Sequence, residues 1–174
     1  MTEGIITANI PYYFCIKRTL HAAICISNQP SRSVERHNKP EVEVGEHHEL
    51  LLNPLLICRS DQERTLIETG INSVRVSVCF QKSDSLAELI SRKYVGFLAQ
   101  RADKIFVLRK KPTKDYDISF LITHEEAETM HKSKVIDFIV QFIADIDKDV
   151  TEMKIATNNR SRRAALEFFQ SLNF

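Results

Sequence analysis

The stretch from Glu125 to Ile155 has neither glycine nor proline, and this uninterrupted run limits the fold more than any other feature of the chain. Since nothing in it breaks a helix, it predicts one helix over about 125–155, about 46 Å long at 1.5 Å per residue. Thr123 and Glu126 form a capping box at its start, where each side chain bonds the other residue's backbone N–H. A helix of this length predicts an architecture in which other elements pack along a rod.

The apolar residues of this helix spread over more than one face. Twelve of the 21 residues from 135 to 155 are apolar, which exceeds the single stripe that a surface helix usually has. The polar positions follow one another at steps of three and four residues: Asp137, Gln141, Asp145, Lys148 and Glu152. A small sheet covers only part of such a rod, so we predict that a partner covers the remainder.

Short apolar or alternating runs precede the long helix and predict five strands. They are Leu55–Cys58, Thr65–Glu68, Val74–Phe80, Ile105–Leu108 and Ile118–Thr123. In the third run the even-numbered residues from 74 to 80 are apolar, which is typical of a half-buried strand. Ser85 and Glu88 form a second capping box, which predicts a helix between the third and fourth strands. The other connections are too short for parallel crossovers, so the sheet is predicted to be mostly antiparallel.

The N-terminal part is predicted to be a helix followed by a loop. Asn9 is a suitable N-cap with Pro11 in the first turn, and apolar residues recur at helical spacing up to about Ser27. From Ser31 to Glu49 the chain is polar and is predicted to be an ordered loop with one short alternating piece at Val42 and Val44. The fold class is therefore α+β: one two-layer domain over residues 1–174, with an N-terminal helix, an antiparallel sheet and the long C-terminal helix.

A cluster of basic residues lies near the C-terminus. Thr157-Asn158-Asn159 is predicted to interrupt the long helix, and a short helix is expected after it. The basic residues on either side of the interruption are Lys154, Arg160, Arg162 and Arg163. The cluster is either solubilising surface charge or a binding site for an acidic surface, protein or nucleic acid.

No catalytic or cofactor-binding pattern is found. The four glycines are isolated, so no phosphate-binding loop is predicted. His47 and His48 are adjacent and have no partner at zinc-like spacing, and His37 has no activated nucleophile near it in the sequence. Residues 145–149 have the acidic composition of a calcium loop but lack its glycine. We predict no enzyme activity, no cofactor and no metal.

Charge and hydropathy narrow the class of protein. The net charge of +1 argues against a chain devoted to nucleic acid, which would be strongly basic. The four cysteines form no Cys-x-x-Cys pair and are predicted to be reduced and buried. No signal peptide is recognisable, and no run approaches the ~20 apolar residues of a bilayer span. We expect a cytosolic protein without membrane insertion.

Five segments resemble subunit four, the twenty-kilodalton subunit, of the actin-related protein 2/3 complex. They are Val34–Glu43, Glu49–Pro54, Ile71–Arg75, Tyr116–Thr123 and Asp145–Lys148. Similarity extends from about Tyr12 to Phe174. The resemblance implies a fold like the two domains of subunit two. It also implies a non-catalytic scaffold in the cytoplasmic actin cytoskeleton, with the nucleotide bound by the actin-related subunits.

The resemblance also implies two partners. Subunits two and four of this family pair through their long helices, and this surface is predicted to include Phe138, Phe142, Ile146 and Val150. The assembly lies against a mother actin filament during branch nucleation, and the basic cluster is predicted to contact that filament. The alternatives are a small nucleic-acid-binding or adaptor domain that uses the basic cluster, and an enzyme whose convergent catalytic groups the sequence does not reveal.

Overall fold

The computed structural model describes residues 3–27, 39–45, 48–80, 88, 92, 94–96 and 107–172. The predictions for His37, His47 and the capping box at Ser85 lie outside these residues. Of the helix expected after Ser85, residues 88, 92 and 94–96 are described, and all of them are helical.

Four antiparallel strands form one sheet in the order β1-β2-β3-β4. They are β1 (Leu55–Ser60), β2 (Glu63–Thr69), β3 (Ser73–Cys79) and β4 (Ile118–Thr123). Each strand pairs with the next along the chain, and the register of β1 with β2 shifts between Cys58 and Ser60. The predicted α+β class and these four predicted strands are confirmed.

Of the fifth predicted strand, Ile105–Leu108, only residues 107 and 108 are described, and these two belong to none of the named strands. Leu108 makes an isolated bridge with Phe120 of β4, and the Leu121 N–H donates to the Val107 carbonyl over 2.8 Å. The Arg109 N–H also donates to the Ser119 carbonyl over 2.9 Å. Pro112, which has no N–H to donate to a strand, follows three residues later.

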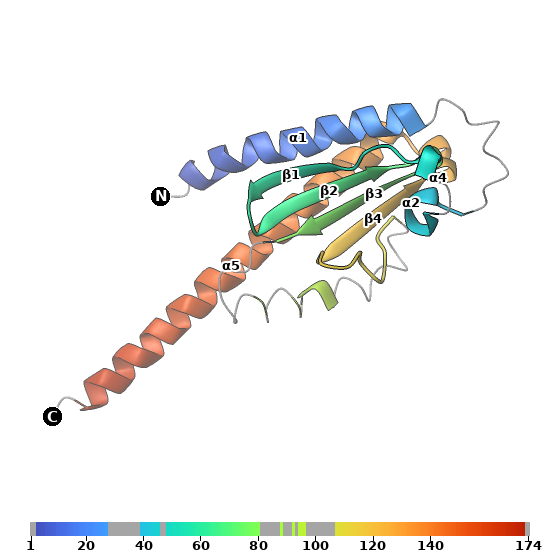
Figure 1. Ribbon diagram of the computed structural model, residues 1–174. Helices are drawn as coiled ribbons and strands as arrows, with labels where there is room; N and C mark the ends of the chain where they lie inside the picture. Colours follow the sequence, from blue (N-terminus) through green and yellow to red (C-terminus); the bar gives the residue numbers. More distant parts are fainter. Residues whose placement is uncertain are drawn as a thin grey trace.

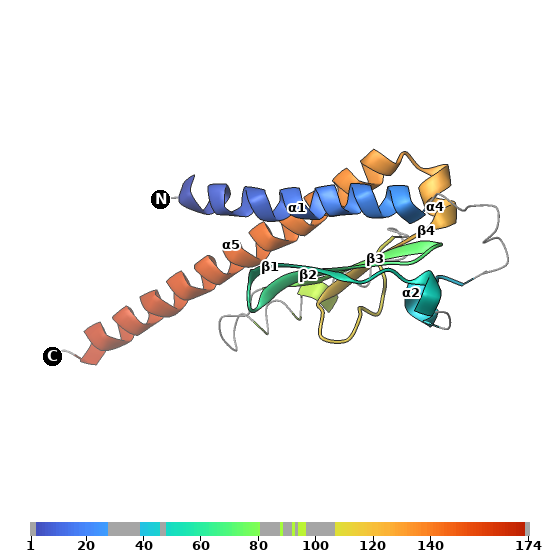
Figure 2. The ribbon, with the colours of Figure 1, turned by 45° about the horizontal axis from the view of Figure 1, so that its top comes forward.

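Two helices, α1 (Glu3–Ser27) and α5 (Lys132–Leu172), lie on the same side of the sheet (Figures 1 and 2). Apolar residues at alternating positions along the strands point toward them and form the core with Ile16 and Leu20 of α1. The fully buried side chains of the sheet and α5 in this core are Ile67, Val74, Val76, Val78, Phe120, Ile136, Ile139, Ile143 and Ile146. The alternation predicted for β3 is therefore confirmed.

The predicted start of the first helix is wrong. The helix begins at Glu3, and Pro11 lies inside it rather than in its first turn. A proline inside a helix removes one intrahelical hydrogen bond and crowds the preceding turn. Burial of Ile16, Leu20 and Ile24 holds the helix C-terminal to the proline, and the chain before Pro11 continues in the same direction.

The alternating piece predicted at Val42 and Val44 is instead a one-turn helix, α2 (Glu41–Val44), which ends at Gly45 with φ 62°. Its N-terminal amides are bonded by residues that precede and begin β3. The Asn72 side-chain oxygen accepts from the Glu41 N–H over 2.9 Å, and the Asn72 amide donates to the Lys39 carbonyl over 2.9 Å. The first bond satisfies a helix N–H that Pro40, which has no polar side chain, cannot bond, and the second holds Asn72 against the residue before Pro40.

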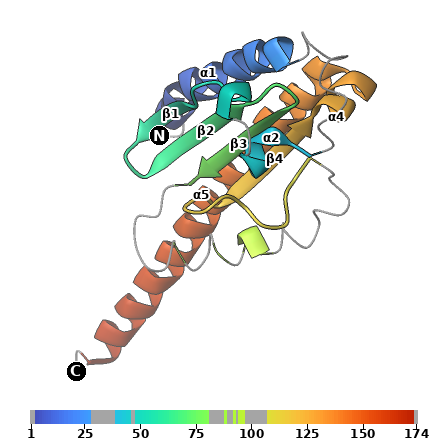
Figure 3. The same ribbon diagram turned by 45° about the vertical axis from the view of Figure 1, so that its right-hand side comes forward.

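The long helix begins later and ends later than predicted. The capping box of Thr123 and Glu126 is confirmed, but the helix it opens, α4 (His124–Thr129), stops after six residues. Met130 is extended, and α5 starts at Lys132. The break lets the chain turn from the end of β4 back across the sheet, which one straight rod cannot do (Figure 3).

The interruption predicted at Thr157-Asn158-Asn159 is also wrong. Helix α5 continues without a break for 41 residues, about 60 Å at 1.5 Å per residue. Threonine and asparagine cost a helix only about half a kcal/mol each, and neither removes a backbone N–H. The Thr157 hydroxyl donates to the Met153 carbonyl over 2.7 Å, so its polar group is bonded within the helix.

Candidate functional site

The four residues predicted at the pairing surface form one row along α5, and this row turns from solvent into the chain's own core. Phe138 is 41% exposed, and Phe142 is half-buried against Phe120 with ring centroids 5.7 Å apart. Ile146 and Val150 are 2% and 3% exposed, and both belong to the core. The last two are therefore covered by this chain itself and are not available to a partner in this conformation.

The helical repeat explains why the row turns. At 3.6 residues per turn, each step of four residues rotates the side chain by about 40°. Three steps from Phe138 to Val150 thus rotate the row by roughly 120°, which takes it from the exposed side of α5 to the buried side.

The C-terminal half of α5 extends away from the sheet (Figures 1 and 3). Val150 is the last fully buried apolar residue of this helix in the described part of the chain. The helix continues to Leu172, about 33 Å further at 1.5 Å per residue. On this projecting half Ile155 is 53% exposed, and Ala156 and Ala164 are exposed as well. Where its side chains are described, this half of α5 is largely uncovered by the domain.

All four predicted basic residues lie on the projecting half. Arg160, Arg162 and Arg163 are exposed and Lys154 is half-buried. Because the helix is continuous, its repeat puts Lys154 and Arg162 within about 80° of each other and Arg160 and Arg163 within about 60°. The two pairs point in nearly opposite directions. Arg163 also lies 3.5 Å from the Glu167 carboxylate. The structure therefore places the four residues on one segment but not on one face.

A half-buried polar cluster ties α1, β1, β2 and α5 together. The Arg59 guanidinium donates to the carboxylates of Glu63 and Asp147, over 2.9 Å in the second case. The Tyr13 hydroxyl donates to the same Asp147 carboxylate over 2.6 Å. Arg59 lies over the rings of Tyr12 and Tyr13, with its central carbon 5.2 and 6.0 Å from their centroids. The cluster fixes the direction of α5 relative to the sheet near the point where the helix leaves it.

The Tyr13 hydrogen bond predicts a pH dependence of stability. Burial, and then the bond to Asp147, raise the pKa of Tyr13 above its ordinary value. A raised pKa means that the folded chain retains a proton that the unfolded chain loses above about pH 10, so stability falls as the pH rises from there. We expect Tyr13→Phe to lower the free energy of unfolding by about 1.5–3 kcal/mol at pH 7, since the acceptor is charged.

The measurement is urea unfolding of both chains between pH 7 and pH 11. The mutant should lose less stability than the wild type above pH 10, by up to about 1.4 kcal/mol per pH unit. Tyr12→Phe is the matched control, because its hydroxyl bonds the neutral Thr65 side chain over 2.7 Å. It should cost only about 1 kcal/mol at pH 7. Identical losses of unfolding free energy at pH 7 in the two mutants would contradict the assigned role of the Asp147 charge.

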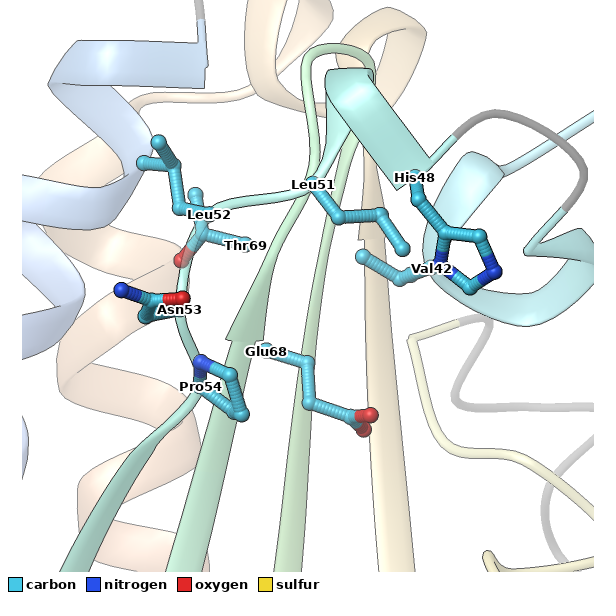
Figure 4. A pocket seen from close by; sticks show the side chains of 8 residues that line it. All are labelled: Val42, His48, Leu51, Leu52, Asn53, Pro54, Glu68 and Thr69. Carbon is cyan, nitrogen blue, oxygen red and sulfur yellow. The ribbon is translucent and has the colours of Figure 1, made fainter.

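A pocket of about 290 Å³ opens where the chain enters β1 (Figure 4). Val42, Leu51 and His48 point toward one another there, and Pro54 and Glu68 lie along its other end. Gly70 packs against two of the lining residues, since an added Cβ would lie 3.2 Å from both Leu51 and Val42. The Glu68 carboxylate is paired with Arg75 over 2.6 and 2.9 Å, so the pocket has no uncompensated carboxylate from this residue.

Within the described ranges, no three histidine, cysteine, aspartate or glutamate side chains gather in a way that would hold a metal ion. None of the helices in the described part of the chain combines the length and the apolar character needed to cross a bilayer.

Sequence reasoning missed several exposed apolar side chains. Leu52, Leu55 and Leu56 are 50–55% exposed at the edge of the sheet, and Ile155 is 53% exposed on α5. A signal for the first three was present, because the run Leu50-Leu51-Leu52-Asn53-Pro54-Leu55-Leu56 has no charged residue. No sequence pattern marks Ile155 as exposed, because its exposure depends on where the sheet ends.

Comparisons with a family model and with known proteins all point to the same family. The family model described as ARP2/3 complex 20 kDa subunit (ARPC4) matches residues 5–171. The chain is 49% identical to Actin-related protein 2/3 complex subunit 4 of Dictyostelium discoideum, over 95% of this chain and 98% of the relative. It is 47% identical to the probable subunit 4 of Caenorhabditis elegans, over 94% and 96%. It is 43% identical to subunit 4 of Saccharomyces cerevisiae, over 89% and 91%.

Proposed function

The chain belongs to the family of the ARP2/3 complex 20 kDa subunit (ARPC4), and from this premise we propose that it is a non-catalytic scaffold subunit of the actin-related protein 2/3 complex. In this role it acts in the cytoplasmic actin cytoskeleton during the nucleation of branched filaments. The observation that best supports a scaffold is the projecting half of α5, which the described part of the domain leaves uncovered.

We propose that the projecting half of α5 pairs with subunit two of the complex. An exposed helix of this length with apolar residues among its polar ones is what a partner helix covers in a helix pair. The exposure of Phe138 and Ile155 supports a surface that begins on the domain and continues along the projecting half. Ile146 and Val150 support this surface from inside, since they hold α5 on the sheet.

We also propose that basic residues of the projecting half contact the mother actin filament. Three of the four predicted residues are exposed arginines on a segment that extends away from the domain. Such a segment reaches a surface that the rest of the domain does not. Pairing of these cations with acidic groups of actin would be electrostatic and therefore sensitive to salt.

The scaffold role is tested by purifying the tagged chain from its own cells and identifying the proteins that elute with it. We expect the actin-related subunits and subunit two in equal amounts with the chain. Elution of the chain alone, or with nucleic acid as its main companion, would contradict the proposal.

The pairing surface predicts a specific effect of Ile155→Asp. Ile155 is 53% exposed, so the change leaves the core of the domain intact. If a partner helix covers Ile155, the variant interface loses the ~1.5–3 kcal/mol that burial of the isoleucine contributes. It also gains a buried, unpaired charge. We expect assembly with subunit two to weaken by at least tenfold, measured by co-purification over a dilution series.

The matched control is Lys148→Asp, which places the same residue on the polar stripe of the same helix, where Lys148 is exposed. Assembly of this variant should change less than threefold, because the solvated ion pair that it breaks, between Lys148 and Glu152, contributes little. Normal assembly of Ile155→Asp would show that subunit two binds elsewhere.

A further inference from the structure

The strand β1 is one edge of the sheet: none of the described strands pairs with its outer side, and α1 runs alongside it (Figure 3). Every second residue of an edge strand directs its N–H and C=O away from its only neighbour. Leu55 is 54% and Leu56 55% exposed, and these two side chains lie on opposite faces of the sheet. An arriving strand would therefore find backbone hydrogen-bonding groups together with apolar side chains on both sides.

The first four residues of β1 lack the usual protection against pairing, although Arg59 follows them in the same strand. Exposed edges commonly have lysines, inward charges or prolines along the strand. Leu55–Cys58 has no charged residue and no proline. Pro54 precedes the strand, and the register shift with β2 comes only after Cys58. Four consecutive residues are thus uncharged, in regular register with β2 and open to pairing on their outer side.

The pocket beside this edge suggests what would be bound. It lies at the N-terminal end of β1. Apolar and polar residues line it in equal number: Val42, Leu51, Leu52 and Pro54 with His48, Asn53, Glu68 and Thr69. Its carboxylate, Glu68, already has a bidentate partner in Arg75. An uncharged apolar side chain at the end of an added strand fits this lining, whereas a lysine or arginine would have to compete with Arg75. Added strands are commonly recognised by backbone bonds together with such a side-chain pocket.

We propose that the β1 edge binds an extended, uncharged segment of another subunit of the complex as an added strand, with one apolar side chain in the adjacent pocket. This inference rests on the proposed function. A four-residue pairing with one pocket falls well short of the roughly 1,000 Å² that a stable interface between two free chains needs. A segment of a subunit that other contacts already hold in the complex is present at a high effective concentration. Its binding to β1 therefore does not need that area.

Hydrogen exchange of the purified assembled complex, resolved to single amides, tests the proposal. If a strand is added, all amides from Leu55 to Cys58 should exchange within about tenfold of those of Thr65 and Ile67 in β2. An open edge would leave every second one exchanging at least 100-fold faster. In a complex with Leu56→Lys the fast exchange should return, since the charge would disfavour an apolar partner. Ile10→Lys, the same change at a residue 59% exposed on α1, should leave β1 unaffected.

A photoreactive benzoylphenylalanine in place of Leu56 identifies the bound segment. Cross-linking to another subunit supports the proposal, and cross-linking to a second copy of this chain overturns it. Fast exchange at alternate β1 amides in the intact wild-type complex also overturns it. If the chain co-purifies with the other subunits and the edge is open, only this inference fails. If it co-purifies with none of them, the proposed function fails as well.

Discussion

Replacing Arg59 by alanine is expected to lower the free energy of unfolding by about 3–5 kcal/mol, because it leaves buried carboxylates without their counter-charge. The side chains of Glu63 and Asp147 are only 6% and 16% exposed, and Arg59 pairs with both. Without the guanidinium, two negative groups from β2 and α5 would remain close together and poorly solvated. Urea unfolding of the purified mutant chain measures the loss.

Two further variants separate charge from packing. Arg59→Met keeps an unbranched stem over the rings of Tyr12 and Tyr13, so it should lose nearly as much stability as the alanine variant if the charge dominates. Adding Asp147→Asn to Arg59→Ala should restore part of the loss, since one uncompensated charge is removed.

The control is Arg92→Ala, whose ion pair with Glu88 is solvated, with exposed side-chain fractions of 77% and 49%. It should change stability by less than about 1 kcal/mol. A loss below 1 kcal/mol for Arg59→Ala as well would show that the cluster does not hold α5 in place.

The strands and the capping box at Thr123 were predictable because their signals are local. Alternation along β3 reports which face is buried, and Ser73–Cys79 meets β2 and β4 in the register that this alternation requires. The capping box depends on two residues three positions apart. Signals of this kind need no knowledge of the tertiary structure.

The ends of the long helix were not predictable in the same way. The break at Met130 depends on where the sheet lies relative to the end of β4, and its residue types do not forbid a helix. The residues Thr157-Asn158-Asn159 have weak helix propensity, yet α5 passes through them. Propensities of a few tenths of a kcal/mol decide the conformation only where packing and hydrogen bonding leave it open.

The Arg59 cluster had no sequence signal, because its members are far apart in the chain. Tyr13 and Asp147 are separated by 134 positions and meet only after α1 and α5 are placed on the sheet. The pairing row from Phe138 to Val150 shows the opposite problem. Its spacing of four residues is regular, but its drift around the helix can be interpreted only once the buried face is known.

Reversing all four basic residues, Lys154, Arg160, Arg162 and Arg163, to glutamate is expected to weaken binding of the assembled complex to filament sides by about 100-fold or more at low salt. Each exposed charge contributes at most about 1 kcal/mol, so more than one change is needed for a large effect. Reversing a residue that faces the filament replaces attraction by repulsion, and changing all four includes whichever residues face it. Branch formation should fall in parallel. Co-sedimentation with actin filaments over a salt series measures the binding, and the difference should shrink as salt rises.

The continuous helix makes this prediction sharper, because the two pairs of cations face nearly opposite directions. A filament surface on one side of α5 reaches only one pair, so reversing that pair should cause most of the loss and reversing the other should cause little. The two double variants, Lys154→Glu with Arg162→Glu and Arg160→Glu with Arg163→Glu, are matched controls for each other, since each changes the net charge by the same amount. Both complexes should assemble normally, because the arginines are exposed and Lys154 is half-buried at the edge of the apolar face. Equal losses from the two double variants would indicate attraction by net charge alone, and undiminished binding of the fourfold variant at low salt would rule out these residues as the filament contact.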